Sequence, residues 1–157
     1  MLKALTHNFF SIGIGLYLAL RVEGRPVLDS ILVIWLAVAT NAVIDGLGHW
    51  TRDGAPVRSY RTHSVFTAPL WGMTVASTSF YLLDASTGGT TTLGRLSWGL
   101  GLGVVMAYSH LLLDAPTEGG VFFGRRRMAI AHFRYDNGLL NAAFAGLGAA
   151  LAAVALF

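Results

Sequence analysis

Short polar segments divide the chain into five long apolar runs, and these runs limit the possible folds more than any other feature of the sequence. Each run approaches the ~20 residues that an α-helix needs to cross the hydrocarbon core of a bilayer. We therefore predict an all-α fold, a polytopic transmembrane bundle of about five helices, with residues 1–157 in a single domain. The predicted spans are residues 8–22, 27–47, 65–83, 93–113 and 138–157.

The amino-acid composition agrees with a location in the membrane. Hydrophobic residues make up 54% of the chain and charged residues 12%, where about a quarter is usual in soluble domains. The chain has no cysteine, so any metal must be bound by nitrogen and oxygen ligands. The basic residues fall in short loops between the apolar runs, so we expect no nucleic acid partner.

The lysines and arginines are divided unevenly between the two ends of the predicted helices. Eight lie at one end and three at the other, and together they are all 11 in the chain. The positive-inside rule then places the N-terminus in the cytoplasm and the C-terminus outside. The first group is Lys3, Arg52, Arg58, Arg61, Arg125, Arg126, Arg127 and Arg134, and the second is Arg21, Arg25 and Arg95.

Histidine and aspartate side chains stand at the borders of these runs, where ionisable groups are costly unless they are paired, hydrated or bound to something. Asn41, Asp45 and His49 are four residues apart, so they share one face of a helix. The predicted topology brings four of the five histidines and two aspartates to the same cytoplasmic face, which favours a metal site. The candidate ligands are His7, Asp45, His49, His63, His110 and Asp114.

Each of these motifs also has a purely structural interpretation. Asp45 and His49 can form an ordinary hydrogen bond at a helix end, where the helix dipole favours a positive histidine. Asp114 can fix the tautomer of a histidine. Ser64 can cap the helix that begins beside His63. The metal site is indicated by the shared position of these residues and not by any one motif.

Four segments also carry a family resemblance: Thr6-His7-Asn8, Ile44-Asp45-Gly46-Leu47-Gly48-His49, Arg61-Thr62-His63-Ser64, and residues 110–120 with the sequence HLLLDAPTEGG. Together they resemble an archaeal branch of the membrane-bound metal-dependent hydrolases, the group that includes the LexA-binding inner-membrane protein of bacteria. That group is similar to zinc-dependent phospholipase C and P1-type nuclease, which are helical enzymes that cleave phosphoric esters. The resemblance implies that the metal ligands are His7, Asp45, His63, His110 and Asp114.

On this resemblance we expect a membrane-embedded metal-dependent hydrolase of a phosphoric ester. A divalent cation would lower the pKa of a bound water to ~7, with Asp45 or Glu118 accepting the proton. Nitrogen and oxygen ligands suit zinc best, with manganese or iron as alternatives. The chain has fewer histidines than the soluble enzymes, so we expect one or two ions and not three.

A site at the headgroup level, in a chain without a soluble domain, is best reached by a molecule already in the membrane. We therefore expect a membrane lipid as partner, and a phospholipid or polyprenyl-phosphate ester as substrate. The positive-inside rule and anionic headgroups also account for a basic loop without a substrate. His132 in that loop is either a ligand or an interfacial residue. The arginines that are candidates for binding the phosphate are Arg61, Arg125, Arg126, Arg127 and Arg134.

Two other kinds of function stay open. A structural or assembly protein would use the histidines and aspartates as an interhelical network, with or without a stabilising metal. A structural role predicts that the ligands are buried without a substrate cleft, whereas an enzymatic role predicts an open coordination position on the metal. An ion transporter would place ionisable groups near the bilayer midplane, which this sequence does not. Small residues such as Gly99 and Gly103 let helices approach closely, and the same faces could mediate a homo-oligomer.

Overall fold

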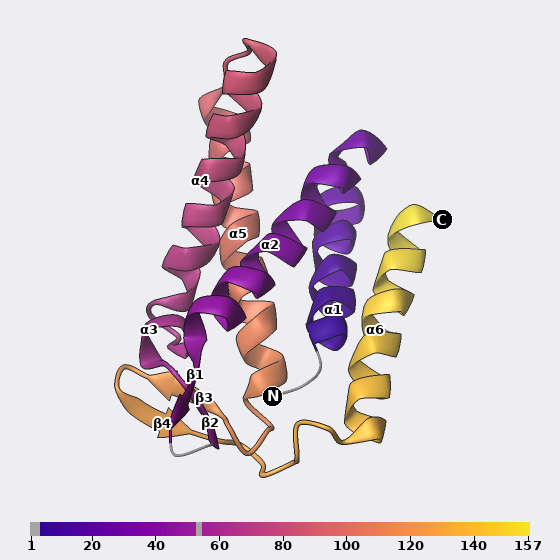
Figure 1. The fold of residues 1–157 in the computed structure, drawn as a ribbon. Coiled ribbons are helices and arrows are strands. Elements are labelled where there is room, and N and C mark those ends of the chain that lie inside the picture. Colours follow the sequence, from indigo (N-terminus) through magenta and orange to yellow (C-terminus); the bar gives the residue numbers. More distant parts are fainter. Residues whose placement is uncertain (1–3, 53–54) are drawn as a thin grey trace.

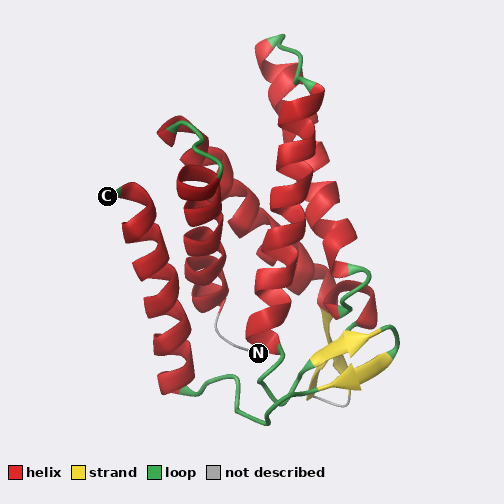
Figure 2. Ribbon diagram, turned by 180° about the vertical axis from the view of Figure 1, so that it is seen from behind, coloured by secondary structure: helices red, strands yellow, loops and turns green. Residues whose placement is uncertain are grey.

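The computed structural model describes residues 4–52 and 55–157, and the chain is mostly helical. Six α-helices and two β-hairpins make up this described part, and both hairpins lie at one end of the helices (Figures 1 and 2). The predicted all-α fold is therefore confirmed for most of the chain. The helices are α1 (Ala4–Leu16), α2 (Ser30–Gly48), α3 (Tyr60–His63), α4 (Ala68–Thr87), α5 (Leu93–Asp114) and α6 (Gly138–Leu156).

The two hairpins are an addition that the apolar runs do not predict. Strand β1 (His49–Arg52) pairs with β2 (Ala55–Arg58), and β3 (Val121–Phe123) pairs with β4 (Arg126–Met128), both antiparallel. In the first hairpin His49 lies opposite Arg58. Lys3, which contributes to the predicted orientation, lies outside the described residues, as does the side chain of Arg52.

Three helices among the described residues are long and apolar enough to cross a membrane, namely α2, α5 and α6, which is consistent with a membrane protein. The structure thus supports three of the five predicted spans. In the first predicted span, α1 ends after 13 residues and continues as a π-helix, η1 (Tyr17–Val22). In the third, α4 carries hydroxyl side chains that lower its hydropathy, and Thr74 and Ser79 donate hydrogen bonds back to the carbonyls of Leu70 and Val75.

Alternate connections of the chain return to the same end of the helices (Figure 1). The beginning of α1, the segment between α2 and α4, and the segment between α5 and α6 all lie at the end that carries the hairpins. The C-terminal end of α6 lies at the opposite end (Figure 1). This arrangement brings residues from distant parts of the sequence together beside the hairpins.

Two helix pairs cross at glycines. Helix α1 packs on α6 where Gly13 faces Gly148, and α4 packs on α5 where Gly72 faces Gly103. At each of these glycines an added Cβ would collide with backbone atoms of the partner helix, so any larger residue would force the helices apart. Helix α2 crosses in front of α5 and α1 in Figure 1 and contacts α1, α4 and α5.

The interior changes in character along the bundle. The largest apolar cluster lies away from the hairpins and includes the fully buried Leu36 and Met106, with Phe80 2% exposed. Toward the hairpins the buried side chains become polar, and Ser11 and Ser109 share a hydrogen bond of 2.6 Å between α1 and α5. Buried polar groups are tolerated when they are hydrogen-bonded, and two smaller apolar clusters, around Ile44 and around Phe10, pack beside them in this region.

Candidate metal centre

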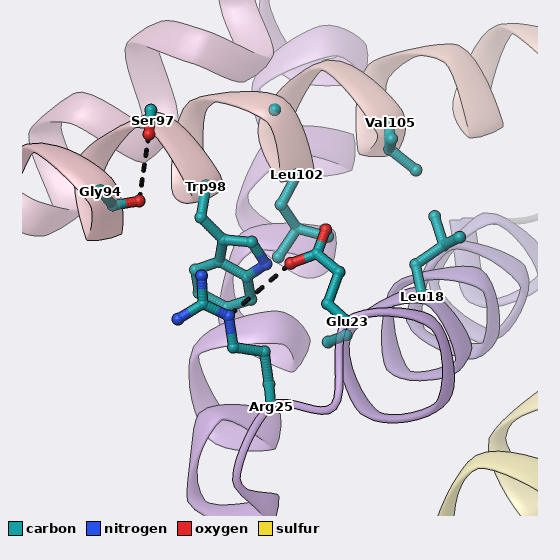
Figure 3. Close-up of a pocket in the computed structure, with 10 residues that line it drawn as sticks. Leu18, Glu23, Arg25, Gly94, Ser97, Trp98, Leu102 and Val105 are labelled. Atoms are coloured by element: carbon teal, nitrogen blue, oxygen red, sulfur yellow. Dashed lines mark hydrogen bonds and ion pairs between the residues drawn. The ribbon is translucent and has the colours of Figure 1, made fainter.

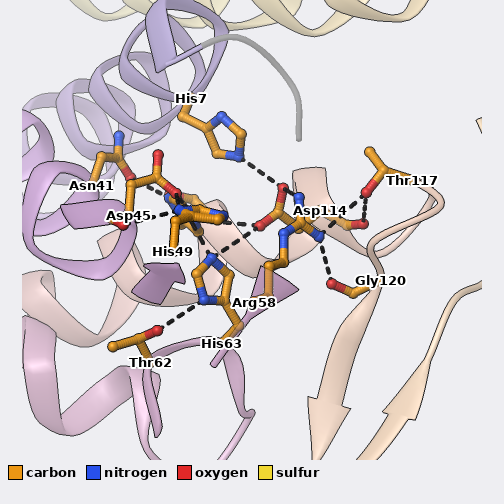
Figure 4. Close-up of polar contacts among 12 residues, drawn as sticks. His7, Asn41, Asp45, His49, Arg58, Thr62, His63, Asp114, Thr117 and Gly120 are labelled. Atoms are coloured by element: carbon orange, nitrogen blue, oxygen red, sulfur yellow. Dashed lines mark hydrogen bonds and ion pairs between the residues drawn. The ribbon is translucent and has the colours of Figure 1, made fainter. Parts of the chain in front are cut away.

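The structure brings six of the predicted site residues together at the hairpin end of the bundle (Figure 4). They come from five elements, α1, α2, β1, α3 and α5. Four are completely buried, whereas the side chains of Asp45 and His49 are 15% and 20% exposed. The buried four are His7, His63, His110 and Asp114.

Four ligand atoms of this group converge, and we call them the acceptor cluster: Asp45 Oδ1, His63 Nε2, His110 Nε2 and Asp114 Oδ2. His63 Nε2 lies 3.7 Å from Asp45 Oδ1 and 3.6 Å from Asp114 Oδ2. His110 Nε2 lies 3.4 Å from each of the same two oxygens. All four atoms are buried, and none has a hydrogen-bond partner among the described residues. A buried polar atom without a partner is costly, so four at one place require an explanation.

The tautomer of His110 follows from its neighbours. The amide nitrogen of Asn41 donates hydrogen bonds to Asn8 Oδ1 at 2.9 Å and to Ser11 Oγ at 3.3 Å. Its amide oxygen therefore faces His110 and accepts a hydrogen bond of 3.1 Å from Nδ1–H. With Nδ1 protonated, a neutral His110 presents the lone pair of Nε2 to the acceptor cluster, and a charged His110 holds a proton there, 3.4 Å from Asp45 Oδ1 and from Asp114 Oδ2.

His63 is arranged in the same way by a different partner. Its Nδ1 lies 2.8 Å from Thr62 Oγ1, whose hydroxyl donates to the carbonyl of Ser59 at 3.5 Å and so accepts from the imidazole. Burial lowers the pKa of His63 to about 4, so the ring is neutral at neutral pH. Nε2 of His63 again presents a lone pair. Gly48 makes this position possible, because a Cβ there would collide with Thr62 and His63.

The donor set fits a metal cation. Two carboxylate oxygens face two imidazole nitrogens, and their negative charge is balanced either by a bound metal cation or by a proton on His110 Nε2. Metal–ligand bonds of 2.0–2.2 Å in a tetrahedral zinc site place neighbouring ligand atoms roughly 3.3–3.6 Å apart. Of the six distances within the acceptor cluster, the four between histidine and aspartate atoms are 3.4–3.7 Å and close to that range.

The second oxygen of Asp114 is held by Arg58, which in the sequence is only one of several basic loop residues. Arg58 is buried, and its Nη2 donates a hydrogen bond of 2.7 Å to Asp114 Oδ1. Its Nη1 donates to the carbonyl of Gly120 at 2.6 Å and to Thr117 Oγ1 at 3.3 Å. His7 Nε2 lies 3.2 Å from the same Oδ1. Asp114 is thereby turned so that Oδ2 alone faces the acceptor cluster.

His7 and His49 flank the acceptor cluster on two sides. The ring of His7 lies 4.3 Å from that of His110, and the ring of His49 lies 4.9 Å from that of His63. Nδ1–H of His49 donates to the carbonyl of Asp45 at 2.9 Å, and its buried Nε2 has no partner among the described residues. The six residues can also be divided into two triads whose ligand atoms lie within 4.8 Å of one another, so the site has donors for a second ion.

The structure does not bring the remaining predicted site residues into this group. Glu118, predicted as a proton acceptor, is exposed and forms no hydrogen bond or ion pair through its carboxylate with a described residue. Arg134 pairs with Asp136 at 3.0 Å, and Arg125 lies over the ring of Tyr60. His132 is also exposed. The predicted phosphate-binding arginines are all exposed at the hairpin end: Arg61, Arg125, Arg126, Arg127 and Arg134.

A comparison with known protein families identifies the family of this chain. The family described as "Protein of unknown function (DUF1286)" matches residues 2–113, which is more than half of the chain. The chain belongs to the DUF1286 family. The DUF1286 match contains every residue of the group except Asp114, which follows its last residue. No curated protein and no solved structure matches the chain.

Proposed function

We propose that this DUF1286 protein is a membrane-embedded metal-dependent hydrolase of a phosphoric ester in a lipid-type substrate. The observation that carries the proposal is the acceptor cluster, whose four buried lone pairs suit one divalent cation, most simply zinc. The resemblance of the same residues to membrane-bound metal-dependent hydrolases supports it. We further propose that five helices cross the cytoplasmic membrane, with the metal site and the N-terminus on the cytoplasmic side.

The residues of the site have different parts in this proposal. A bound divalent cation would supply Lewis acidity and a water that loses its proton near neutral pH. Asp45 and His49 are the members of the group that reach the surface, so substrate and water would approach from their side. Asp45 is placed there to accept a proton. The exposed arginines at this end, beginning with Arg61 beside His63, would attract an anionic headgroup.

A structural metal centre is the second candidate, and a specific observation favours it. The acceptor cluster already contains four protein ligands, which is the full set of a closed structural zinc site, whereas catalytic zinc usually keeps one position for water. In that case the metal would join α2, α3 and α5 without turnover. Asp45 is partly exposed, and its release from the metal would open a coordination position for water. A substitution of Asp45 therefore distinguishes the two candidate functions.

Elemental analysis of protein purified without chelator tests the shared premise. We expect one or two equivalents of a divalent metal, and strong loss in Asp114→Ala and His63→Ala. Matched controls are Asp136→Ala and His132→Ala, which remove exposed residues of the same types and should leave the metal content unchanged. A metal-free wild-type protein would contradict both candidates.

Turnover then distinguishes the two candidates. Metal-loaded protein is incubated in bilayers with phosphoric-ester and phospholipid substrates, beside the Asp45→Asn variant. The hydrolase proposal expects cleavage by the wild type that Asp45→Asn lowers by about 10²-fold or more, the usual scale for loss of a general base. Stoichiometric metal without any such cleavage would establish the structural centre instead.

A further inference from the structure

One face of α5 is hollowed along the length of the helix. Near the N-terminal end of α5 a cavity of about 420 Å³ is lined by Gly94, Ser97, Trp98 and Gly101 of α5, with Leu18 and Arg25 from the other side. Nearer its C-terminal end a second cavity of about 470 Å³ is lined by apolar side chains such as Ile14 and Leu112. Both volumes are in the range of small-molecule sites. Val105 lines both cavities, so they adjoin as one groove, which we call the α5 groove.

The α5 groove has the length of a bilayer core. From Gly94 to Ala115 it follows 21 residues of chain, which at 1.5 Å per residue is about 32 Å. The hydrocarbon core of a bilayer is about 30 Å thick. Neither His110 nor Asp114 lines the groove, although their neighbours Ser109, Leu111 and Ala115 do.

The α5 groove is lined by charged side chains at one end only. The guanidinium of Arg25 lies 4.7 Å from the centre of the Trp98 ring, and its Nε lies 3.6 Å from the carboxylate of Glu23 (Figure 3). Arg25 and Glu23 are 34% and 45% exposed, so the pair is open to a ligand. No hydrogen bond joins the terminal nitrogens of Arg25 to a described residue. The other end of the groove, around Leu112, is lined almost entirely by apolar surface.

The backbone beside the charged end of the α5 groove departs from a regular α-helix. Leu18 and Ala19 line the cavity and belong to the π-helix η1. Wider π-helical turns occur frequently at functional sites. The turn that follows is fixed by a hydrogen bond of 2.8 Å from the Arg25 amide to the carbonyl of Ala19. The backbone therefore holds Arg25 at the mouth of the groove.

We infer that the Arg25 half of the α5 groove binds an anionic phospholipid, with the phosphate on Arg25 and one acyl chain along α5 from Gly94 to Val105. The terminal nitrogens of Arg25 can donate to a phosphate while its Nε stays beside Glu23, and the apolar channel next to them matches a hydrocarbon chain. Gly94 and Gly101 keep the channel open, since a Cβ at either position would meet nothing within 4 Å. The Arg25 end of the groove lies at the opposite end of the bundle from the hairpins, whereas its apolar end reaches Val121 of β3 (Figure 1).

Tryptophan fluorescence can detect the lipid directly. Replacing Trp35, Trp50 and Trp71 by phenylalanine leaves Trp98 as the only tryptophan. This variant is placed in bilayers of zwitterionic lipid that contain rising fractions of brominated lipid, either anionic or zwitterionic. We expect half-maximal quenching of Trp98 at a fraction of anionic lipid about tenfold lower than that of zwitterionic lipid. Retention of anionic phospholipid by the unmodified protein in native mass spectrometry provides a readout without substitutions.

Two substitutions with matched controls test the two parts of the site. Arg25→Gln should remove the preference for anionic lipid, whereas Arg21→Gln, a neighbouring arginine that donates to the carbonyl of Val154, should not. Gly101→Leu fills the groove and should abolish saturable quenching and lipid retention. Gly146→Leu, an equally open glycine on α6, should leave both unchanged.

Several results would overturn the inference. Equal quenching by the two lipids, or an unchanged preference in Arg25→Gln, would remove the role of the cation. Saturable binding that persists in Gly101→Leu would place the lipid elsewhere. If Gly101→Leu instead converts a dimer to a monomer, the groove holds a helix of a second copy and not a lipid.

Discussion

The two carboxylate oxygens of Asp114 have different partners at the hairpin end of the bundle. Its Oδ1 accepts a hydrogen bond from Arg58 and lies beside His7, while its Oδ2 lies between the bare nitrogens of His63 and His110. Oδ1 thus binds side chains of the surrounding protein, and Oδ2 is available to a metal. The imidazoles are oriented in turn by Asn41 and Thr62, as metal-binding histidines commonly are.

Asn41→Ala should weaken metal binding although Asn41 is not a ligand. His110 Nδ1–H would lose its acceptor, and loss of such a partner typically lowers metal affinity by roughly 10–100-fold. Competition with a chromophoric chelator measures the affinity. Thr40→Val is the matched control, because it removes an adjacent buried hydroxyl that has no partner among the described residues. Equal affinities of the two variants would show that Asn41 does not position His110.

Arg58→Gln should destabilise the fold. Removing one partner of a buried ion pair leaves the other charge uncompensated and costs about 3–5 kcal/mol. Thermal unfolding in detergent should show a clearly lower midpoint. Arg134→Gln removes an exposed ion pair with Asp136 and should change the midpoint little. Similar midpoints for both variants would argue against a structural role for Arg58.

At the scale of elements, the long apolar runs predict more of the secondary structure than the polar segments between them do. The expected spans 27–47, 93–113 and 138–157 correspond closely to α2, α5 and α6, because burial in lipid or core dictates long apolar helices. The hairpins lie in short polar segments, where strand pairing depends on contacts that no local pattern encodes. Arg58 belongs to one of these strands, so its position opposite His49 and beside Asp114 could not be predicted from the sequence.

The site residues, too, are predictable where they lie on long helices and not where they lie in the polar segments. Residues on long helices, such as Asp45 and His110, converge because helix ends have a defined place in a bundle. Side chains in the segment after α5 have no such defined place, and the predicted site residues there, Glu118 and a set of arginines, lie at the surface. The sequence contains no signal that separates the buried Arg58 from these exposed arginines.

Gly72→Ala should destabilise the α4–α5 pair. The new Cβ would collide with the backbone carbonyl of Gly103, and overpacking of this kind costs about 1–3 kcal/mol. Gly146→Ala is the control, since its Cβ would meet nothing within 4 Å and alanine is the better helix former. Unfolding midpoints should fall for the first variant and stay level or rise for the second. The opposite order would contradict the observed helix crossing.

At the scale of the whole molecule, the hairpin end and the α4–α5 turn lie at opposite ends of the bundle (Figures 1 and 2). The proposed orientation places the hairpin end in the cytoplasm. The chain has no cysteine, so one introduced cysteine provides a unique thiol for labelling. Arg127 in β4 and Gly89 after α4 are exposed positions at the two ends.

An impermeant thiol reagent applied to intact cells should label Gly89→Cys and leave Arg127→Cys unlabelled. After permeabilisation both variants should react, which controls for accessibility of each thiol. Labelling of Arg127→Cys alone in intact cells would reverse the orientation. Labelling of both would contradict a bundle that spans the membrane between these two positions.

Helix α6 contributes none of the six residues at the metal centre, and all six precede it in the chain. Proteins are made from the N-terminus onward, and their parts begin to fold in that order. A nascent chain that has reached residue 137 therefore already carries the whole ligand set. Thr6 on α1 and Asn141 on α6 later join through a hydrogen bond of 2.7 Å next to His7. The last helix to be synthesised is thus added to a site whose parts already exist, and it closes one side of it.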